Sequence, residues 1–101
     1  MTDLLICYDF KFNLDVKKRN GKTYKHHVIM GLGFNYQGAL WDIYFKLKKR
    51  KTEILQVNEV TVCRIAFALW QGQSVLAALA DHPPLIPQDL NNSLKYLPKK
   101  V

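Results

Sequence analysis

The stretch "LLICYDFKFNLDVKKRNGKTYKHHVIMGLGF", residues 4–34, has the pattern of two β-strands joined by a turn. In its first half, up to Lys17, apolar side chains occupy the even positions and mainly polar ones the odd positions, as in a strand with one buried face. The second half, from Thr23, again places most of its apolar side chains at even positions. Between them, "KKRNGK", residues 17–22, has the composition of a tight turn. The stretch therefore predicts an antiparallel hairpin.

The length of the turn determines which residues face one another. A two-residue loop, Asn20–Gly21, would place each apolar side chain opposite a polar one, so we reject it. A three-residue loop, Arg19–Gly21, with Gly21 in the left-handed conformation, makes the two apolar faces coincide. It places His26 among core residues and His27 on the opposite face. This register predicts the pairs Val16 with Tyr24, Phe12 with Val28, Phe10 with Met30 and Tyr8 with Leu32.

The next segment, residues 39–51, fits two patterns. Alternating apolar residues suggest a third strand, whereas apolar residues three and four positions apart suggest a helix. Aromatic residues and the turn-like "NYQG" at residues 35–38 favour the strand. In the helical alternative, the cations of "FKLKKRK", residues 45–51, fall in the last turn, where the helix dipole favours positive charge.

The second half of the chain predicts helices. Its first apolar segment is hydrophobic on nearly every side, so we expect a buried helix in which Cys63 is protected and Cys7 is the more reactive thiol. The last helix begins at a capping Asp89 and ends before Pro98. The three expected helices cover residues 58–73, 75–82 and 90–97.

These patterns predict an α+β fold in one domain, residues 1–101. An N-terminal antiparallel hairpin or meander of two or three strands packs against two or three C-terminal helices. A hydrophobic content of 49% and a charged content of 23% are typical of a globular domain. No leader pattern or long apolar run is present, so we expect a cytoplasmic protein with no membrane partner.

Several chemistries are not expected from the motifs. The glycines of "GLGFNYQG", residues 31–38, do not match a dinucleotide fingerprint, and no phosphate-loop lysine follows them. The two cysteines have no partner at metal-ligand spacing. Residues 58–82 have the outline of a helix-turn-helix, but the second helix lacks the polar side chains that read DNA. We therefore expect no metal, no cofactor and no catalytic residue.

The net charge of +7 is concentrated in one half of the chain. Residues 1–51 hold eleven Lys/Arg and four Asp/Glu, whereas residues 52–101 hold four of each. Such asymmetry is typical of a polyanion-binding surface, and a solubilising face gives the same count. If residues 39–51 form a strand, one sheet face carries a row of cations with an aromatic side chain, able to bind phosphates and to stack on a base. The candidate nucleic-acid-binding residues on it are Lys11, Lys25, His27, Tyr44, Lys46, Lys48 and Arg50.

Three functions remain open on these grounds. The first is a small non-enzymatic protein that binds the backbone of RNA or DNA through this basic sheet face. The second is a protein-binding inhibitor or adaptor of the kind encoded by phages and mobile elements, which uses an open sheet edge or an apolar patch around Leu5, Ile29 and Tyr44. Such an edge also allows a homodimer. The third is a ribonuclease-type toxin with His27 as general base.

Overall fold

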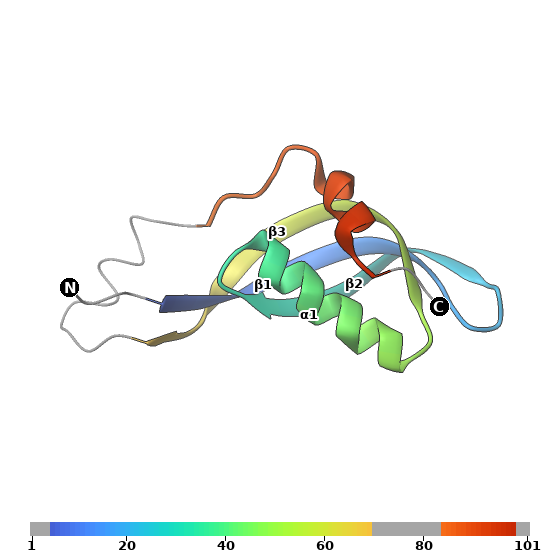
Figure 1. Ribbon diagram of the computed structural model, residues 1–101, viewed down its shortest axis with the longest axis horizontal. Coiled ribbons are helices and arrows are strands. Elements are labelled where there is room, and N and C mark those ends of the chain that lie inside the picture. The colour runs from blue at the N-terminus through green and yellow to red at the C-terminus, as the bar shows by residue number, and fades with distance from the viewer. Residues whose placement is uncertain (1–4, 70–83, 99–101) are drawn as a thin grey trace.

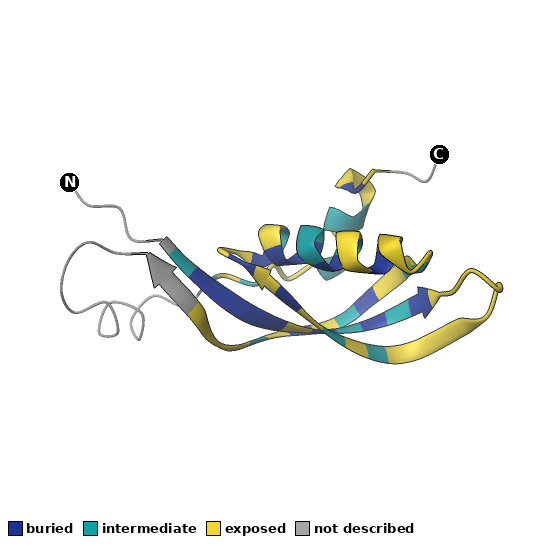
Figure 2. Cartoon of the chain, turned by 90° about the horizontal axis from the view of Figure 1, so that it is seen from below, coloured by how far each residue is buried: buried dark blue, intermediate teal, exposed yellow. Residues whose placement is uncertain are grey.

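The computed structural model describes residues 5–69 and 84–98. Within them, a three-stranded antiparallel sheet has the strand order β2-β1-β3, so the first strand lies in the centre. One α-helix crosses one face of the sheet, and a short 3-10 helix lies beside it (Figures 1 and 2). The α+β prediction is confirmed at this level. In chain order the elements are β1 (Leu5–Lys17), β2 (Thr23–Gly33), α1 (Tyr36–Lys49), β3 (Glu53–Leu69) and η1 (Leu90–Tyr96).

The segment expected to be a third strand is the helix α1, so the strand prediction for residues 39–51 is wrong. Asn35 caps the helix, because its side-chain oxygen accepts a hydrogen bond from the Gly38 N–H at 2.8 Å. The other end carries three lysines in the last turn, where the helix dipole favours them. The residues that α1 buries against the sheet are Tyr36, Ala39, Leu40, Ile43 and Leu47.

Two glycines of β2 allow α1 to lie close to the sheet. A Cβ atom on Gly31 would lie 2.7 Å from Cγ1 of Ile43 and 2.8 Å from the carbonyl oxygen of Ala39. A Cβ atom on Gly33 would overlap the backbone of Ala39. Any side chain at these two positions would push the helix away from the strand.

The turn of the hairpin is formed as predicted. Gly21 is left-handed with a φ of 85°, and the Lys18 N–H donates to the Lys22 carbonyl at 2.8 Å. Val16 is opposite Tyr24, so the first predicted pair is confirmed. Beyond this pair, the register shifts at a β-bulge that contains His26, whose φ is 58°.

The bulge makes the other three predicted pairs wrong. Phe12 pairs with Ile29 rather than Val28, Phe10 with Gly31 rather than Met30, and Tyr8 with Gly33 rather than Leu32. Side chains of paired residues share a face, so the odd positions of β2 face the helix after the bulge and the even positions face away.

The two histidines are also placed differently from the prediction. His26 is exposed, whereas His27 lies opposite the fully buried Leu14 on the helix side of the sheet. The assignment of His26 to the core and of His27 to the outer face is therefore wrong. The cause is the extra residue of the bulge, which reverses the faces of every later position.

The predicted helix at residues 58–73 is wrong as far as Leu69, because these residues belong to β3. β3 pairs with β1 through four register shifts. Cys63 lies at one of them and is exposed, so the expected burial of Cys63 is wrong, and Cys7 is the less accessible of the two thiols. Residues 70–73 and the helix expected at 75–82 lie outside the described residues.

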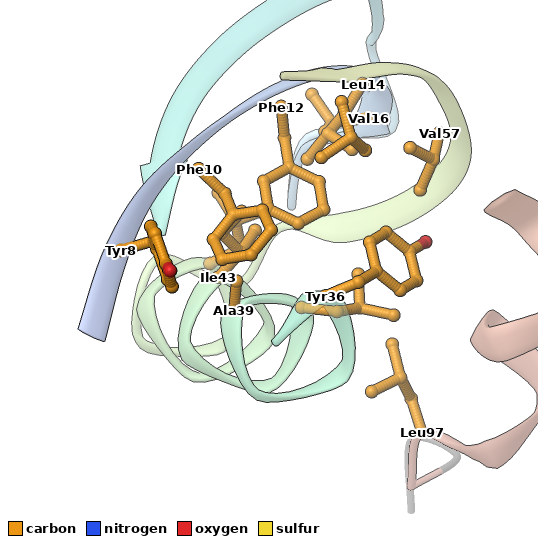
Figure 3. Packing of buried hydrophobic residues seen from close by; sticks show 13 residues of the cluster. Tyr8, Phe10, Phe12, Leu14, Val16, Tyr36, Ala39, Ile43, Val57 and Leu97 are labelled. Carbon is orange, nitrogen blue, oxygen red and sulfur yellow. The ribbon is translucent and has the colours of Figure 1, made fainter. Parts of the chain in front are cut away.

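The core lies between β1 and α1. The side chains of Phe10, Phe12, Leu14 and Val16 are fully buried and point from β1 toward the helix (Figure 3). The rings of Phe12 and Tyr36 are 5.8 Å apart, and Tyr36 donates through its hydroxyl to the Leu90 carbonyl at 2.6 Å. Burial raises the pKa of Tyr36 to about 12.

The C-terminal segment closes the edge of β3. Asp89 caps η1 by accepting from the Asn92 N–H at 3.2 Å, which confirms the predicted cap, although the helix is of the 3-10 type. The side-chain oxygen of Asn91 accepts from the Val57 N–H at 2.7 Å, and its amide donates to the Val57 carbonyl at 3.2 Å. Asn91 thus takes the place of a neighbouring strand at this edge.

Candidate functional surfaces

The predicted nucleic-acid-binding residues do not form one row on the sheet, because four of the seven lie on a helix or at its cap. Lys11 is exposed on the outer face of β1, Lys25 lies in the β2 bulge, and His27 faces the helix side. The remaining four residues, Tyr44, Lys46, Lys48 and Arg50, lie on α1 or at its C-terminal cap.

Two of these residues make contacts that hold the fold together. Lys46 lies 2.9 Å from the Asp42 carboxylate and donates to the Met30 carbonyl at 3.0 Å, while Asp42 accepts from the Leu32 N–H at 2.7 Å. These bonds partly cover the free edge of β2. Tyr44 donates through its hydroxyl to the Pro98 carbonyl at 3.1 Å.

Most of the positive charge gathers at one end of the molecule. β3 begins at Glu53, which pairs with Lys17, so the start of this strand brings the β1–β2 turn beside the end of α1. Figures 1 and 2 both show these two segments at the same end of the long axis. We call this region the basic end. Its nine cations, all exposed, are Lys17, Lys18, Arg19, Lys22, Lys25, Lys48, Lys49, Arg50 and Lys51.

The cations of the basic end form no ion pair within the described residues, although Lys25 interacts electrostatically with Asp15. In residues 5–69 and 84–98, the ion pairs are Lys46–Asp42 and Arg64–Asp9, and neither includes a cation of the basic end. Two of its lysines lie over aromatic rings, Lys18 at 4.8 Å from the centroid of Tyr24 and Lys48 at 5.7 Å from that of Tyr44. Like charges so close together produce a positive field that attracts polyanions.

A second exposed surface is apolar. After the bulge, Val28, Met30 and Leu32 face away from the helix and are 50%, 39% and 41% exposed. We call these three residues the apolar stripe. The sequence does not predict the apolar stripe, because the alternation of residues along β2 places these side chains in the core.

The apolar patch expected around Leu5, Ile29 and Tyr44 has two residues that are not freely exposed. Ile29 and Tyr44 are partly buried against the core, and the side chain of Leu5 lies outside the described part of the structure. The apolar stripe, in contrast, consists of three exposed hydrophobic residues on one strand.

A polar network joins the three strands on the outer face. The Asn58 amide donates to Asn13 at 3.0 Å and to Asp15 at 2.8 Å, and the His26 N–H donates to Asp15 at 3.2 Å. The hydrogen bond from Asn58 is the main cause that lowers the pKa of Asp15. These contacts tie the bulges of β2 and β3 to β1. Among the residues that the structure describes, no group of three metal-ligating side chains comes together.

Comparison with known protein families, with curated proteins and with solved structures finds no match to this chain. Neither helix in the described ranges is long and apolar enough to cross a lipid bilayer.

Proposed function

We propose that this protein binds nucleic acid through the basic end. The observation that supports the proposal is the meeting of two cationic segments far apart in the sequence, the hairpin turn and the end of α1. Together they hold nine of the fifteen Lys/Arg of the chain, all exposed, with Asp15 and Glu53 as their nearest acidic neighbours in the sequence.

The expected mode of binding is electrostatic and tolerant of base sequence. Each lysine or arginine that neutralises a phosphate releases a condensed counterion, which favours binding at low salt. The cations are on flexible side chains at a turn and a helix end, and these suit phosphate contacts better than reading of base edges in a groove. The protein acts by binding and not by catalysis.

Three double variants, each of which removes two positive charges, test the proposal. Lys18 and Arg19 to Gln remove charge from the hairpin turn, Lys49 and Arg50 to Gln remove it from the end of α1, and Lys11 and Lys95 to Gln are the control pair. For a single-stranded oligonucleotide, either pair at the basic end should flatten the log–log salt dependence of binding by about 1.4, because each lost phosphate contact contributes about 0.7. The control pair should change it by less than about 0.5.

Two results would count against the proposal. If the three pairs weaken binding equally, the cations act as a diffuse field and no site exists at the basic end. If the unmodified protein binds neither RNA nor DNA at low salt, the proposal is wrong.

The apolar stripe supports a second candidate function, binding of a protein partner. Exposed apolar side chains that adjoin one another on a strand are typical of interaction surfaces. A saturable complex that survives nuclease treatment and is lost on Met30→Glu supports this candidate. A partner that binds Met30→Glu unchanged excludes the apolar stripe as the contact.

A further inference from the structure

α1 carries two aromatic side chains outside the row of residues that it buries against the sheet. Trp41 and Phe45 are four residues apart, so they are neighbours on the helix surface. Their ring centroids are 5.4 Å apart, and the ring planes are tilted by 33°. We call these two rings the aromatic pair. Neither residue is among those that α1 buries in the core.

The neighbouring Tyr44 holds the aromatic pair from the side. Its ring stands edge-on to both rings, at 75° to Trp41 and 73° to Phe45, and its hydroxyl is bonded to Pro98. Trp41 and Tyr44 also pack partly against the core, whereas Phe45 does not and is 50% exposed. Phe45 therefore presents an aromatic surface that is not buried in the core.

The aromatic pair adjoins the basic end. Lys48 and Lys49 follow Phe45 by three and four residues, so they flank its ring on the helix surface. Asp42, the acidic residue of α1, is already bonded to Lys46 and to the backbone of β2. A ligand that reaches Phe45 from the basic end thus meets cations and aromatic rings, and the one carboxylate of the helix is neutralised.

We infer that the aromatic pair stacks on unpaired bases, so that the ligand of the basic end is single-stranded nucleic acid. This inference rests on the proposed function. Cations that track the phosphates beside an aromatic surface that takes base faces are the combination that single-strand-binding proteins use. In a duplex the base faces are covered by their neighbours and only the edges are reachable, so the aromatic pair gives a duplex nothing to stack on.

Phe45→Leu tests the inference, and Phe34→Leu is its matched control. Both phenylalanines are 50% exposed, but Phe34 precedes α1 and lies far from its basic last turn. The probes are a short oligothymidylate and a DNA duplex with the same number of phosphates. Phe45→Leu should weaken binding of the oligothymidylate roughly five-fold or more, because a stacked base is worth about 1–3 kcal/mol. The affinity for the duplex and the salt dependence of oligothymidylate binding should stay unchanged.

The outcomes separate this inference from the proposed function. Phe34→Leu should bind both probes like the unmodified protein, and both variants should keep its melting temperature. If Phe45→Leu binds the oligothymidylate as well as the unmodified protein does, the inference is wrong and the proposed function stands. If the unmodified protein binds neither probe, both are wrong. Loss of binding to phosphatidylserine vesicles by Phe45→Leu, with oligothymidylate binding intact, assigns the aromatic pair to a membrane surface and overturns the inference.

Discussion

The two outer strands of the sheet both pair with β1, yet they depart from regular pairing in different ways. β2 has one register shift, at the left-handed His26. β3 has four register shifts, and none of its described residues is left-handed. A bulge inserts one residue, so each shift exchanges the faces of all later positions.

In β2 the single exchange serves the packing of the helix. It places Gly31 and Gly33 beneath α1, where a side chain would collide with the helix. It also turns Val28, Met30 and Leu32 to the outside. The apolar stripe is thus a consequence of the close approach of α1.

In β3 most of the described apolar residues follow the shifts and pair with inward residues of β1, whereas Leu55, at a bulge, is 44% exposed. The positions paired with the inward residues of β1 are Ile54, Val57, Val60, Val62, Ile65 and Ala68. The residues on the outer side, such as Gln56, Glu59 and Thr61, are polar and exposed. Among the described residues, the outer face of the sheet carries an apolar row along β2 and mainly polar residues along β3, so the β2 side offers the larger apolar surface to a hydrophobic partner.

The largest effect should come from adding one methyl group to β2. Gly33→Ala should destabilise the fold by about 3 kcal/mol or more, because the new Cβ atom meets backbone atoms of α1 that cannot rotate away. Gly38→Ala is the control, because its Cβ atom would meet Asn35 at an ordinary 3.4 Å and alanine favours a helix by up to about 1 kcal/mol. Chemical denaturation measures both. Equal stability of the two variants would mean that α1 does not pack on β2.

A smaller loss is expected at the edge of β3 that Asn91 covers. Asn91→Ala should cost about 1–2 kcal/mol, because it removes two hydrogen bonds to the backbone of Val57. Asn92→Ala removes a side chain of the same kind from the same helix and should change the free energy of unfolding by less than about 0.5 kcal/mol. A melting temperature that falls equally in both variants would show that Asn91 has no special role at this edge.

The smallest effect should come from the bulge of β2. His26→Val should destabilise by about 1 kcal/mol, since a β-branched residue is more strained than histidine at a φ of 58°. His26→Gly fits this conformation and should stay within about 0.5 kcal/mol of the unmodified protein. If valine is tolerated as well as glycine in thermal unfolding, position 26 is not left-handed in solution.

Local chemistry made the hairpin turn predictable, but not the register beyond it. The sequence around Gly21 contains what the turn requires. The bulge at His26, in contrast, is required by tertiary packing. It places Gly31 and Gly33 under a helix that follows later in the chain. No pattern within β2 alone reveals such a need.

The two wrong element predictions have a common physical origin. The inward residues of β3 are mostly three positions apart, because each bulge adds a residue, and this spacing imitates the period of a helix. Residues 39–51 fit both periods, and the helix begins at the cap Asn35, inside a segment whose composition predicts a turn. The six β-branched residues of β3 favour a strand over a helix, and they are the local feature that indicates the observed structure.

The candidate site was predictable only in part. The charge asymmetry identified the basic half of the chain, and both cationic segments of the basic end were visible in it. Their meeting depends on the pairing of Lys17 with Glu53, which joins distant parts of the chain. The aromatic pair could be found only once α1 was known to be a helix, because a strand would place Trp41 and Phe45 in line with the core.

The most direct test of the proposed function is a nuclear magnetic resonance titration of ¹⁵N-labelled protein with a short single-stranded oligonucleotide at low salt. We predict that backbone amide shifts change in residues 17–25 and 46–51 together, along one binding curve, and that those of Val28, Met30 and Leu32 stay in place. Shifts that change along the apolar stripe while both cationic segments remain unperturbed would contradict binding at the basic end.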